Sequence, residues 1–354
     1  MSPLISIIIP FYNTPKKEFY RCIDSLRKQT FTEFEVVIIN DGSRKECVEY
    51  LESVTYSDNR YRVIKKKNEG AAVARNIGIN KAVGEYIMFL DSDDAITNFC
   101  LEEAAELVTG YHPDLIIGGV RRNSEEVMNT WEAKKNKRPR ITEVKTGGMR
   151  NSLISHMIGR PEEVYNLQEG YISDGPVARL IKKEIADKAT FSEENMWNED
   201  TIWNAEILNK CRDIIIIDSW WYKYFINSNS QTRCFRPNCP YEFSYRTKQE
   251  IALFEKIWPN CMQGIYTRAF NDITILCRTY IFHPDNPYSF KKNYATYLKC
   301  IHGDAFRGAL RKIEFKEERR FLYRIVKEIL RFCLCYGPHY VAYLILLIYY
   351  RLEK

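Results

Sequence analysis

The chain has 354 residues, which is long enough for about two domains with a large buried core. Hydrophobic residues make up 45% and charged residues 28%, a balance that excludes collagen-like, intrinsically disordered and multi-span membrane proteins. The formal net charge of +6 is small for this length, so we expect no binding to nucleic acid.

The N-terminal hundred residues alternate short apolar runs with amphipathic segments. Residues 4–9 form a β-branched run before Pro10, which predicts a buried strand, and residues 16–29 place apolar side chains at helical spacing. The alternation continues with predicted strands over 34–39, 61–65 and 86–90 and predicted helices over 45–51, 71–81 and 100–108. This rhythm predicts right-handed crossovers and a mostly parallel sheet, whose ligands bind at the carboxyl ends of the strands.

The pattern is weaker in the remainder of the chain. Residues 114–120 and 214–218 are predicted strands, whereas the polar stretch 121–148 is predicted to be an insertion loop with some strand content. From about residue 228 long helical periodicities follow. We therefore expect an α/β domain over 1–230 and a helical region over 231–354.

The C-terminal segment combines positive charge with apolar surface. Residues 311–331 carry eight basic and four acidic side chains with one apolar helical face. Residues 332–350 are apolar and rich in Tyr, but a Gly-Pro-His sequence interrupts them, so they are short for a span of about 20 residues. We expect residues 311–350 to lie on an anionic membrane surface. Packing on the rest of the protein, or on a second subunit in a homodimer, is the alternative.

Eleven cysteines are spread along the chain without a CxxC pair or the Cys/His spacing of a zinc site. The first residues lead directly into an apolar segment and do not resemble a signal peptide. Because thiols stay reduced in the cytosol, we expect a cytoplasmic protein, peripheral to the inner membrane if the C-terminal segment binds lipid, with most cysteines in the core.

Acidic side chains follow the predicted strand 86–90. Carboxylate oxygens suit Mg²⁺ or Mn²⁺, which bridge the two phosphates of a nucleotide sugar and stabilise the leaving charge. In the Asp91-Ser92-Asp93 triplet we predict Asp93 as the direct metal ligand, with Asp91 holding ribose hydroxyls or a metal-bound water. We expect Asp94 either to cap the next helix or to touch the sugar. A simple turn or cap is the structural alternative for the triplet.

Two earlier predicted strands end in polar residues on the same expected edge of the sheet. Asp41 is positioned to accept a hydrogen bond from the imide N–H of uracil or thymine, and Tyr12 offers a ring that stacks on the base. Ordinary strand-to-helix turn chemistry is the alternative for Asp41. The coincidence with the acidic triplet favours nucleotide binding.

A glycine-containing segment, residues 68–78, opens the helix predicted over 71–81. Its small residues allow backbone N–H groups to approach anionic oxygens. Arg75, one turn into the helix, is expected to point at a diphosphate or to pair with an acidic residue of the sheet edge. An exposed surface arginine is the alternative.

These four segments together resemble the family 2 glycosyltransferases of the GT-A fold. That family carries, in order, Pro-x-Tyr-Asn, Asp-Gly-Ser, Asn-x-Gly-x-x-x-Ala-Arg-Asn-x-Gly and Asp-x-Asp-Asp. The corresponding residues cover about positions 4–98 in the same order, and they are Pro10-Phe11-Tyr12-Asn13, Asp41-Gly42-Ser43, Asn68 to Gly78 and Asp91-Ser92-Asp93-Asp94.

The resemblance implies a GT-A catalytic domain over 1–230, that is, a Rossmann-like, mostly parallel sheet flanked by helices. It implies an inverting, metal-dependent transfer from a nucleoside diphosphate sugar, with a UDP-sugar favoured, to a saccharide or lipid-linked saccharide. Bacterial capsule, exopolysaccharide or lipopolysaccharide synthesis is the expected setting. The donor-binding residues would then include Pro10, Tyr12, Asn13, Asn68 and Gly70.

The resemblance also implies a general base about a hundred residues after the acidic triplet. Glu199-Asp200 fits, with Asp200 as the base and Glu199 as its neighbour; a helix N-terminus is the structural alternative. Asp174 is a candidate contact to the sugar, and Trp197 a candidate stacking platform for the acceptor. A nucleotidyltransferase, or a non-catalytic carbohydrate-binding protein of this fold, remains the competing function.

Overall fold

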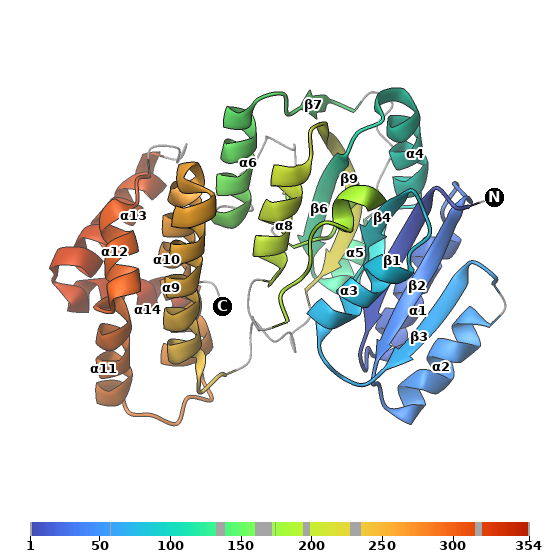
Figure 1. Cartoon of the computed structure of the whole chain (residues 1–354). Coiled ribbons are helices and arrows are strands. Elements are labelled where there is room, and N and C mark those ends of the chain that lie inside the picture. Colours follow the sequence, from blue (N-terminus) through green and yellow to red (C-terminus); the bar gives the residue numbers. More distant parts are fainter. Residues whose placement is uncertain are drawn as a thin grey trace. The chain divides into compact units, whose positions relative to one another are not determined.

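The computed structural model describes residues 2–56, 58–131, 139–159, 172–173, 175–193, 199–226, 235–315 and 321–352. The chain divides into two compact units (Figure 1). Met1–Arg150 and Pro161–Ile226 form the first, and Asn151–Arg160 and Asn227–Lys354 form the second. The second unit therefore includes a short segment from within the predicted first domain, 1–230.

The first unit begins with four parallel strands in the order β3-β2-β1-β4. Their apolar runs bury both faces, as expected for the centre of a parallel sheet, and the helices between them pack their apolar faces on it. These predicted elements are confirmed. Their bounds are β1 Ile5–Phe11, α1 Lys16–Arg27, β2 Phe34–Asp41, α2 Lys45–Thr55, β3 Tyr61–Lys66, α3 Ala71–Lys81 and β4 Tyr86–Phe89.

The other half of the sheet is mixed. β8 (Arg179–Lys182) lies antiparallel between β4 and β6 (Leu115–Asn123), and β6 pairs in parallel with β9 (Ile214–Phe225). β5 (Ala95–Ile96) and β7 (Ile141–Glu143) both pair antiparallel with β9. The α/β class is confirmed, but these antiparallel strands were not predicted. The helices of this half are α4 Cys100–Tyr111, α5 Glu125–Thr130, α6 Gly147–Gly159, α7 Lys183–Ala186 and α8 Glu199–Lys210.

Two sequence predictions need correction here. The stretch 121–148, expected to be an insertion loop with some strand content, does contain strand, namely the end of β6 and β7, but it also contains the helix α5, which was not expected. The strand expected over 214–218 continues to Phe225. Its second half mixes buried and partly exposed side chains, so the uniformly apolar run ends before the strand does.

The second unit is helical, as expected. Its core is formed mainly by aromatic and aliphatic side chains such as Phe270, Tyr297 and Phe306. The described cysteines of both units are free and buried, in agreement with the expected core positions. The helices are α9 Cys239–Ile257, α10 Met262–Leu276, α11 Phe290–Ile301, α12 Asp304–Lys312, α13 Phe321–Tyr336 and α14 His339–Leu352.

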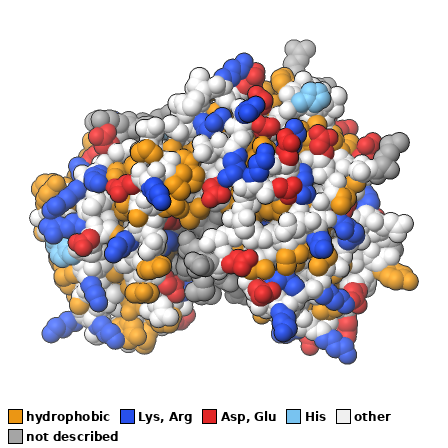
Figure 2. Space-filling model, viewed as in Figure 1, with side chains coloured by type: hydrophobic (Ala, Val, Ile, Leu, Met, Phe, Trp, Pro, Cys, Tyr) orange, Lys and Arg blue, Asp and Glu red, His pale blue; other side chains and the backbone are white. Residues whose placement is uncertain are grey.

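Part of the apolar surface of α13 and α14 is exposed. On α13, Ile329 and Phe332 are 50% and 55% exposed, and on α14 Ile348 is 59% exposed. Figure 2 shows apolar and basic side chains mixed on one face of the molecule. Within the described residues, no helix is long and apolar enough to cross a membrane.

Candidate active site

Hydrogen bonds join the loops that follow β1, β2 and β4. The backbone N–H of Asn13 donates to Ser43 Oγ at 3.1 Å, and Asn13 Oδ1 accepts from the N–H of Arg44 at 2.8 Å. The hydroxyls of Thr14 and Ser92 lie 2.5 Å apart. The segments predicted to bind the donor therefore meet at one edge of the sheet.

Tyr12 and Asn13 form the turn directly after β1. The Tyr12 side chain is 52% exposed, so its ring is accessible for stacking. Asn13 has φ of 50°, in the left-handed region that Asn tolerates better than most residues. Pro10 lies within β1, beside Ile39 of β2.

Asp41, at the end of β2, is 4% exposed and already has several donors. Its carboxylate accepts the backbone N–H groups of Glu69 and Gly70, each at 2.9 Å, and pairs with Lys66. Gly70 has φ of 94°, a conformation that favours glycine. Asp41 thus fixes the loop before α3, and the predicted bond to a base would use its remaining acceptor capacity.

Gly42 also holds the loop before α3 at the edge of the sheet, because its Cα lies close to the backbone of Asn68. A Cβ atom on Gly42 would lie 2.6 Å from the backbone nitrogen of Asn68, and the φ of Gly42 is 72°. No larger residue fits there without moving the loop. Asn68 itself is exposed at the edge of the predicted donor site.

The acidic loop after β4, Asp91 to Asp94, contains a carboxylate with a perturbed pKa at Asp93. Burial, followed by the nearby charge of Asp91, raises the pKa of Asp93 to about 6. The carbonyl oxygen of Asp93 accepts a hydrogen bond from Arg21 Nη2. Two close carboxylates with excess negative charge provide a favourable place for a cation.

Asp94 is 2% exposed. Its carboxylate accepts from the hydroxyl of Tyr222 at 2.8 Å and from the backbone N–H of Phe225 at 2.9 Å, and burial raises its pKa well above the usual range. It therefore connects the acidic loop to β9. These contacts favour a structural role over the expected contact with the sugar.

Arg75 lies between two carboxylates. Its Nη1 donates to Asp200 Oδ1 at 2.8 Å, and its Nη2 lies 3.4 Å from Asp91 Oδ1. The Arg75 side chain is 8% exposed. Arg75 therefore pairs with acidic residues and is not an exposed surface arginine.

Asp200 is the second residue of α8, so it is both near a helix N-terminus and beside Arg75. Its side chain is 30% exposed, and a Cβ atom on Gly175 would lie 3.9 Å from its Oδ2. Arg179 holds the loop around Gly175 by donating to backbone carbonyls, including that of Ser173 at 2.5 Å. Asp174, Trp197 and the side chain of Glu199 lie outside the described residues.

Asn76 supports this arrangement, although sequence reasoning did not select it. Its side chain exchanges two hydrogen bonds of 2.9 Å with the backbone of Phe191. Phe191 stacks on Trp203 of α8, with ring centroids 4.4 Å apart. Asn76 directly follows Arg75 in the Ala-Arg-Asn motif, and this position in the motif could have identified it from the sequence.

No group of three or more His, Cys, Asp or Glu side chains that could hold a metal occurs in the described part of the chain. Asp91 and Asp93 nevertheless fit a divalent ion of the Mg²⁺ type, which commonly uses one or two protein carboxylates and takes its other ligands from substrate phosphates and water. Burial and, after it, the charge of Asp91 raise the pKa of Asp93, and a bound cation would offset both effects.

Comparison with known proteins agrees with this geometry. The model of the family described as glycosyl transferase family 2 matches residues 6–185. The uncharacterized glycosyltransferase EpsJ of Bacillus subtilis is 26% identical over 334 residues, which are 90% of this chain and 89% of that protein. Glycosyltransferase GlyG of Streptococcus pneumoniae is 29% identical over 240 residues, 66% of this chain and 74% of that protein.

Solved structures with a similar fold include S. aureus TarS 1-349, with a TM-score of 0.58 and 19% identity over 94% of this chain and 90% of that one. The same protein in complex with UDP-GlcNAc has a TM-score of 0.56 and 18% identity, with the same coverage. Asp200 lies beyond residue 185, where the family match ends.

Proposed function

The chain belongs to glycosyl transferase family 2, and we propose that it transfers a sugar from a nucleoside diphosphate sugar to a hydroxyl group of a saccharide or lipid-linked saccharide, with inversion at the anomeric carbon. UDP is the favoured nucleotide. The complex of TarS with UDP-GlcNAc supports this choice at the level of a shared fold.

The position of Arg75 is the observation that carries the proposal. One guanidinium reaches both Asp91, from the acidic loop, and Asp200, from α8. These two contacts support the proposal that a carboxylate on the donor side and the base lie around a common point. This is the arrangement that a direct displacement needs, since the donor and the acceptor hydroxyl must meet.

Asp200 is the proposed general base. As the acceptor oxygen bonds to the anomeric carbon, the carboxylate takes the hydroxyl proton, and the bond from that carbon to the phosphate oxygen breaks. The guanidinium of Arg75 donates to Asp200 Oδ1 at 2.8 Å and so fixes the direction in which this carboxylate points. Glu199, at the start of α8, is the proposed neighbour of the base.

Asp91 and Asp93 are the residues that would hold Mg²⁺ or Mn²⁺. A bound divalent ion supplies positive charge that stabilises the leaving diphosphate. Tyr12 would stack on the base of the nucleotide, and Asp41, with Asn13, Asn68 and Gly70, would line the nucleotide side. Ser92 keeps the acidic loop attached to the turn after β1.

The exposed apolar surface of α13 and α14 supports a peripheral position on the cytoplasmic face of a membrane. Basic side chains such as Arg324 and Lys327 lie on the same helix as exposed Ile329 and Phe332. Apolar side chains beside cations suit an interface with anionic lipids. A lipid-linked acceptor for capsule, exopolysaccharide or lipopolysaccharide synthesis would be found at such a surface.

The competing functions have less support. A nucleotidyltransferase would be expected to have a glycine-rich phosphate loop after its first strand, and residues 11–17 contain no glycine. A non-catalytic binding protein would not need an acidic side chain at Asp200 paired with Arg75.

Isothermal titration with UDP in the presence and absence of Mn²⁺ tests the proposal. We expect metal-dependent binding that Asp93→Ala removes. Asp58→Ala is the matched control, because Asp58 pairs with Arg60 in the turn before β3. Failure of the wild-type protein to bind UDP, and any other nucleoside diphosphate of a test set, with metal present would overturn it.

A further inference from the structure

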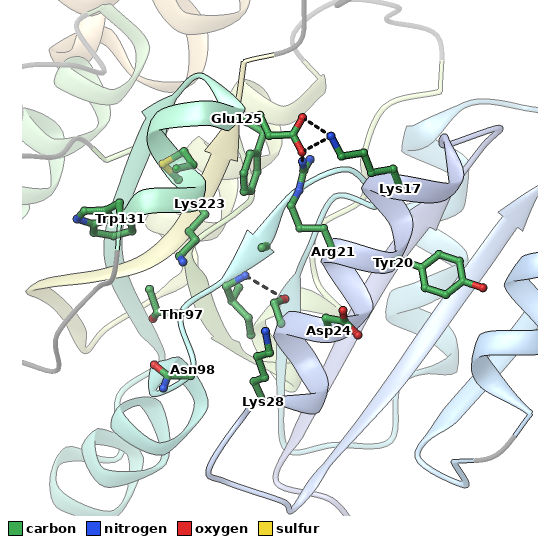
Figure 3. Close-up of a pocket in the computed structure, with 15 residues that line it drawn as sticks. Lys17, Tyr20, Arg21, Asp24, Lys28, Thr97, Asn98, Glu125, Trp131 and Lys223 are labelled. Carbon is green, nitrogen blue, oxygen red and sulfur yellow. Dashed lines mark hydrogen bonds and ion pairs between the residues drawn. The ribbon is translucent and has the colours of Figure 1, made fainter.

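Arg21 of α1 contacts the acidic loop, α5 and β9. Its Nη2 donates to the carbonyl oxygen of Asp93, and its Nη1 lies 3.2 Å from Glu125 Oε1. Its Cζ lies 3.5 Å from the ring centroid of Phe225. Figure 3 shows Arg21 and Lys17 reaching the same carboxylate of Glu125. The Arg21 side chain is 17% exposed, so its guanidinium is held from several sides against the loop.

The following turns of α1 hold the chain directly after the acidic loop. Ser25 Oγ accepts the backbone N–H of Ile96 at 3.2 Å, and Gln29, just beyond the helix, donates to the carbonyl oxygen of Thr97 at 2.7 Å. Residues 21, 25 and 29 are spaced by four, so they lie on one side of the helix. This side of α1 therefore bonds to the backbone in chain order, from the acidic loop to just after β5.

Open space lies beside the same segment. Residues 95–98, together with Arg21 and Ser25, line a cavity of about 730 Å³ whose walls come from α1, β5, α5 and β9 (Figure 3). A segment beside a cavity is not fixed there by close packing, and the cavity gives it room to shift. The hydrogen bonds from α1 are therefore important for keeping the acidic loop in place.

The backbone of Asp93 is fixed from its other side as well. The N–H of Asp94 donates to the carbonyl oxygen of Asp91 at 3.1 Å, and the carboxylate of Asp94 is bonded to β9 as described above. The Asp93 side chain stays partly exposed. When the backbone on both sides of a carboxylate is held, the carboxylate keeps one direction, which is what a metal ligand requires.

We propose that Arg21 is a positioning residue for Asp93, and that its bond to the Asp93 carbonyl sets how tightly the acidic loop holds a divalent ion together with the donor diphosphate. The inference rests on the proposed function, because it takes Asp93 as the metal ligand. The pair with Glu125 contributes less, since Glu125 is 37% exposed and exposed ion pairs are weak.

UDP binding measured over a series of Mn²⁺ concentrations tests this role. Arg21→Gln should need about 10–100-fold more Mn²⁺ for half-maximal binding, which is the usual effect of removing a group that orients a metal ligand. Saturating Mn²⁺ should restore the UDP affinity to nearly the wild-type value, because the ligand is displaced and not lost. A misfolded site would not recover in this way. Arg21→Lys, which keeps the charge and one donor, should lie between the two.

Arg27→Gln is the matched control. Arg27 lies on the same helix, pairs with Asp24 at 3.7 Å and donates to the carbonyl oxygen of Val54 at 3.0 Å, so its loss removes the same kinds of contact away from the acidic loop. It should keep the wild-type dependence on Mn²⁺. Glu125→Gln should shift that dependence by less than about threefold, because it leaves the bond from Arg21 to the loop in place.

Hydrogen–deuterium exchange of the full chain without nucleotide gives a second readout that does not depend on binding. In Arg21→Gln the amides of residues 91–97 should exchange at least about tenfold faster than in the wild type, because the loop has lost a charged hydrogen-bond donor. In Arg27→Gln they should exchange as in the wild type.

The outcomes separate this inference from the proposed function. If the wild type binds UDP and Arg21→Gln shows the wild-type dependence on Mn²⁺ or the wild-type exchange, the role of Arg21 is overturned and the proposed function stands. An equal loss in Arg27→Gln also overturns it, since it would reflect α1 as a whole. If the wild type binds no nucleoside diphosphate at any Mn²⁺ concentration, the proposed function fails, and the metal-directed role of Arg21 fails with it.

Discussion

Arg75 Nη1 lies 2.8 Å from Asp200 Oδ1, although the two residues are 125 positions apart in the chain. The bond joins α3, which begins at the predicted donor site, to the first turn of α8. Because the same guanidinium reaches Asp91, its loss should affect both the acidic loop and the position of the proposed base.

Arg75→Ala is expected to reduce kcat at least about 100-fold, because a preorganised charged donor is lost from the site. It should also lower the free energy of unfolding by about 2 kcal/mol, since it leaves partly buried carboxylates without their partner. Steady-state kinetics and urea unfolding measure the two effects. Arg62→Ala is the control: it removes the more exposed 2.7 Å pair with Glu35 and should leave kcat unchanged. Equal kinetic losses in both variants would argue against a special role for Arg75.

Tyr222→Phe should destabilise the protein by about 1–3 kcal/mol, because the buried carboxylate of Asp94 loses a hydrogen-bond donor at little change in volume. We expect weaker metal-dependent UDP binding as well, since Asp93 is the adjacent residue. Urea unfolding and UDP titration report these changes. Tyr56→Phe, at a side chain that is 93% exposed, should have neither effect. A stable variant would show that the link between Asp94 and β9 is dispensable.

The second unit is expected to lose stability in acid through a histidine pair. The Nε2 atoms of His302 and His339 lie 2.9 Å apart, and burial followed by the charge of His339 lowers the pKa of His302 below 6.5. A histidine whose pKa is lowered by folding contributes stability that is present above 6.5 and is lost as the pH falls through the lowered value. Thermal unfolding between pH 7.5 and 5 should therefore be less pH-dependent in His302→Asn than in the wild type. The same pH dependence in both proteins would refute this.

Charged substitutions on α13 and α14 test the membrane surface. Phe332→Glu and Ile348→Glu should reduce sedimentation with vesicles that contain phosphatidylglycerol, because each places a charge on an exposed apolar face. Binding should also fall as salt is raised. Ile257→Glu, at an exposed apolar residue of α9, is the control. If wild-type protein does not sediment with these vesicles but forms a dimer that Phe332→Glu disrupts, the surface is an interface between subunits.

The sequence patterns predicted the parallel half of the fold well because its strands are buried on both faces. Continuous apolar runs such as residues 34–39 produce an unambiguous signal. β8 escaped prediction because its four residues, Arg179–Lys182, begin and end with cations. Short strands of this kind depend on their tertiary partners.

For the site, sequence reasoning could select residues but not their partners. Ordered motifs identified Arg75 and Asp91, yet only the fold places Asp200 beside them. Arg21 gave no signal, because an arginine on an amphipathic helix usually faces solvent, and its role depends on the path of the acidic loop. Asp94 matched the family pattern, whereas its burial against Tyr222 became visible only in three dimensions.

Release of nucleoside diphosphate from a panel of nucleotide sugars, with Mg²⁺ or Mn²⁺ and a saccharide acceptor, is the decisive measurement for the proposed transfer. We expect metal-dependent release, strongest with a UDP-sugar, that falls by about 10²–10⁴-fold in Asp200→Asn while UDP still binds. Asp187→Asn, at an exposed residue of the turn after α7, should release as much as the wild type. Undiminished release by Asp200→Asn would contradict the assignment of the base, and no release from any donor would contradict the transfer itself.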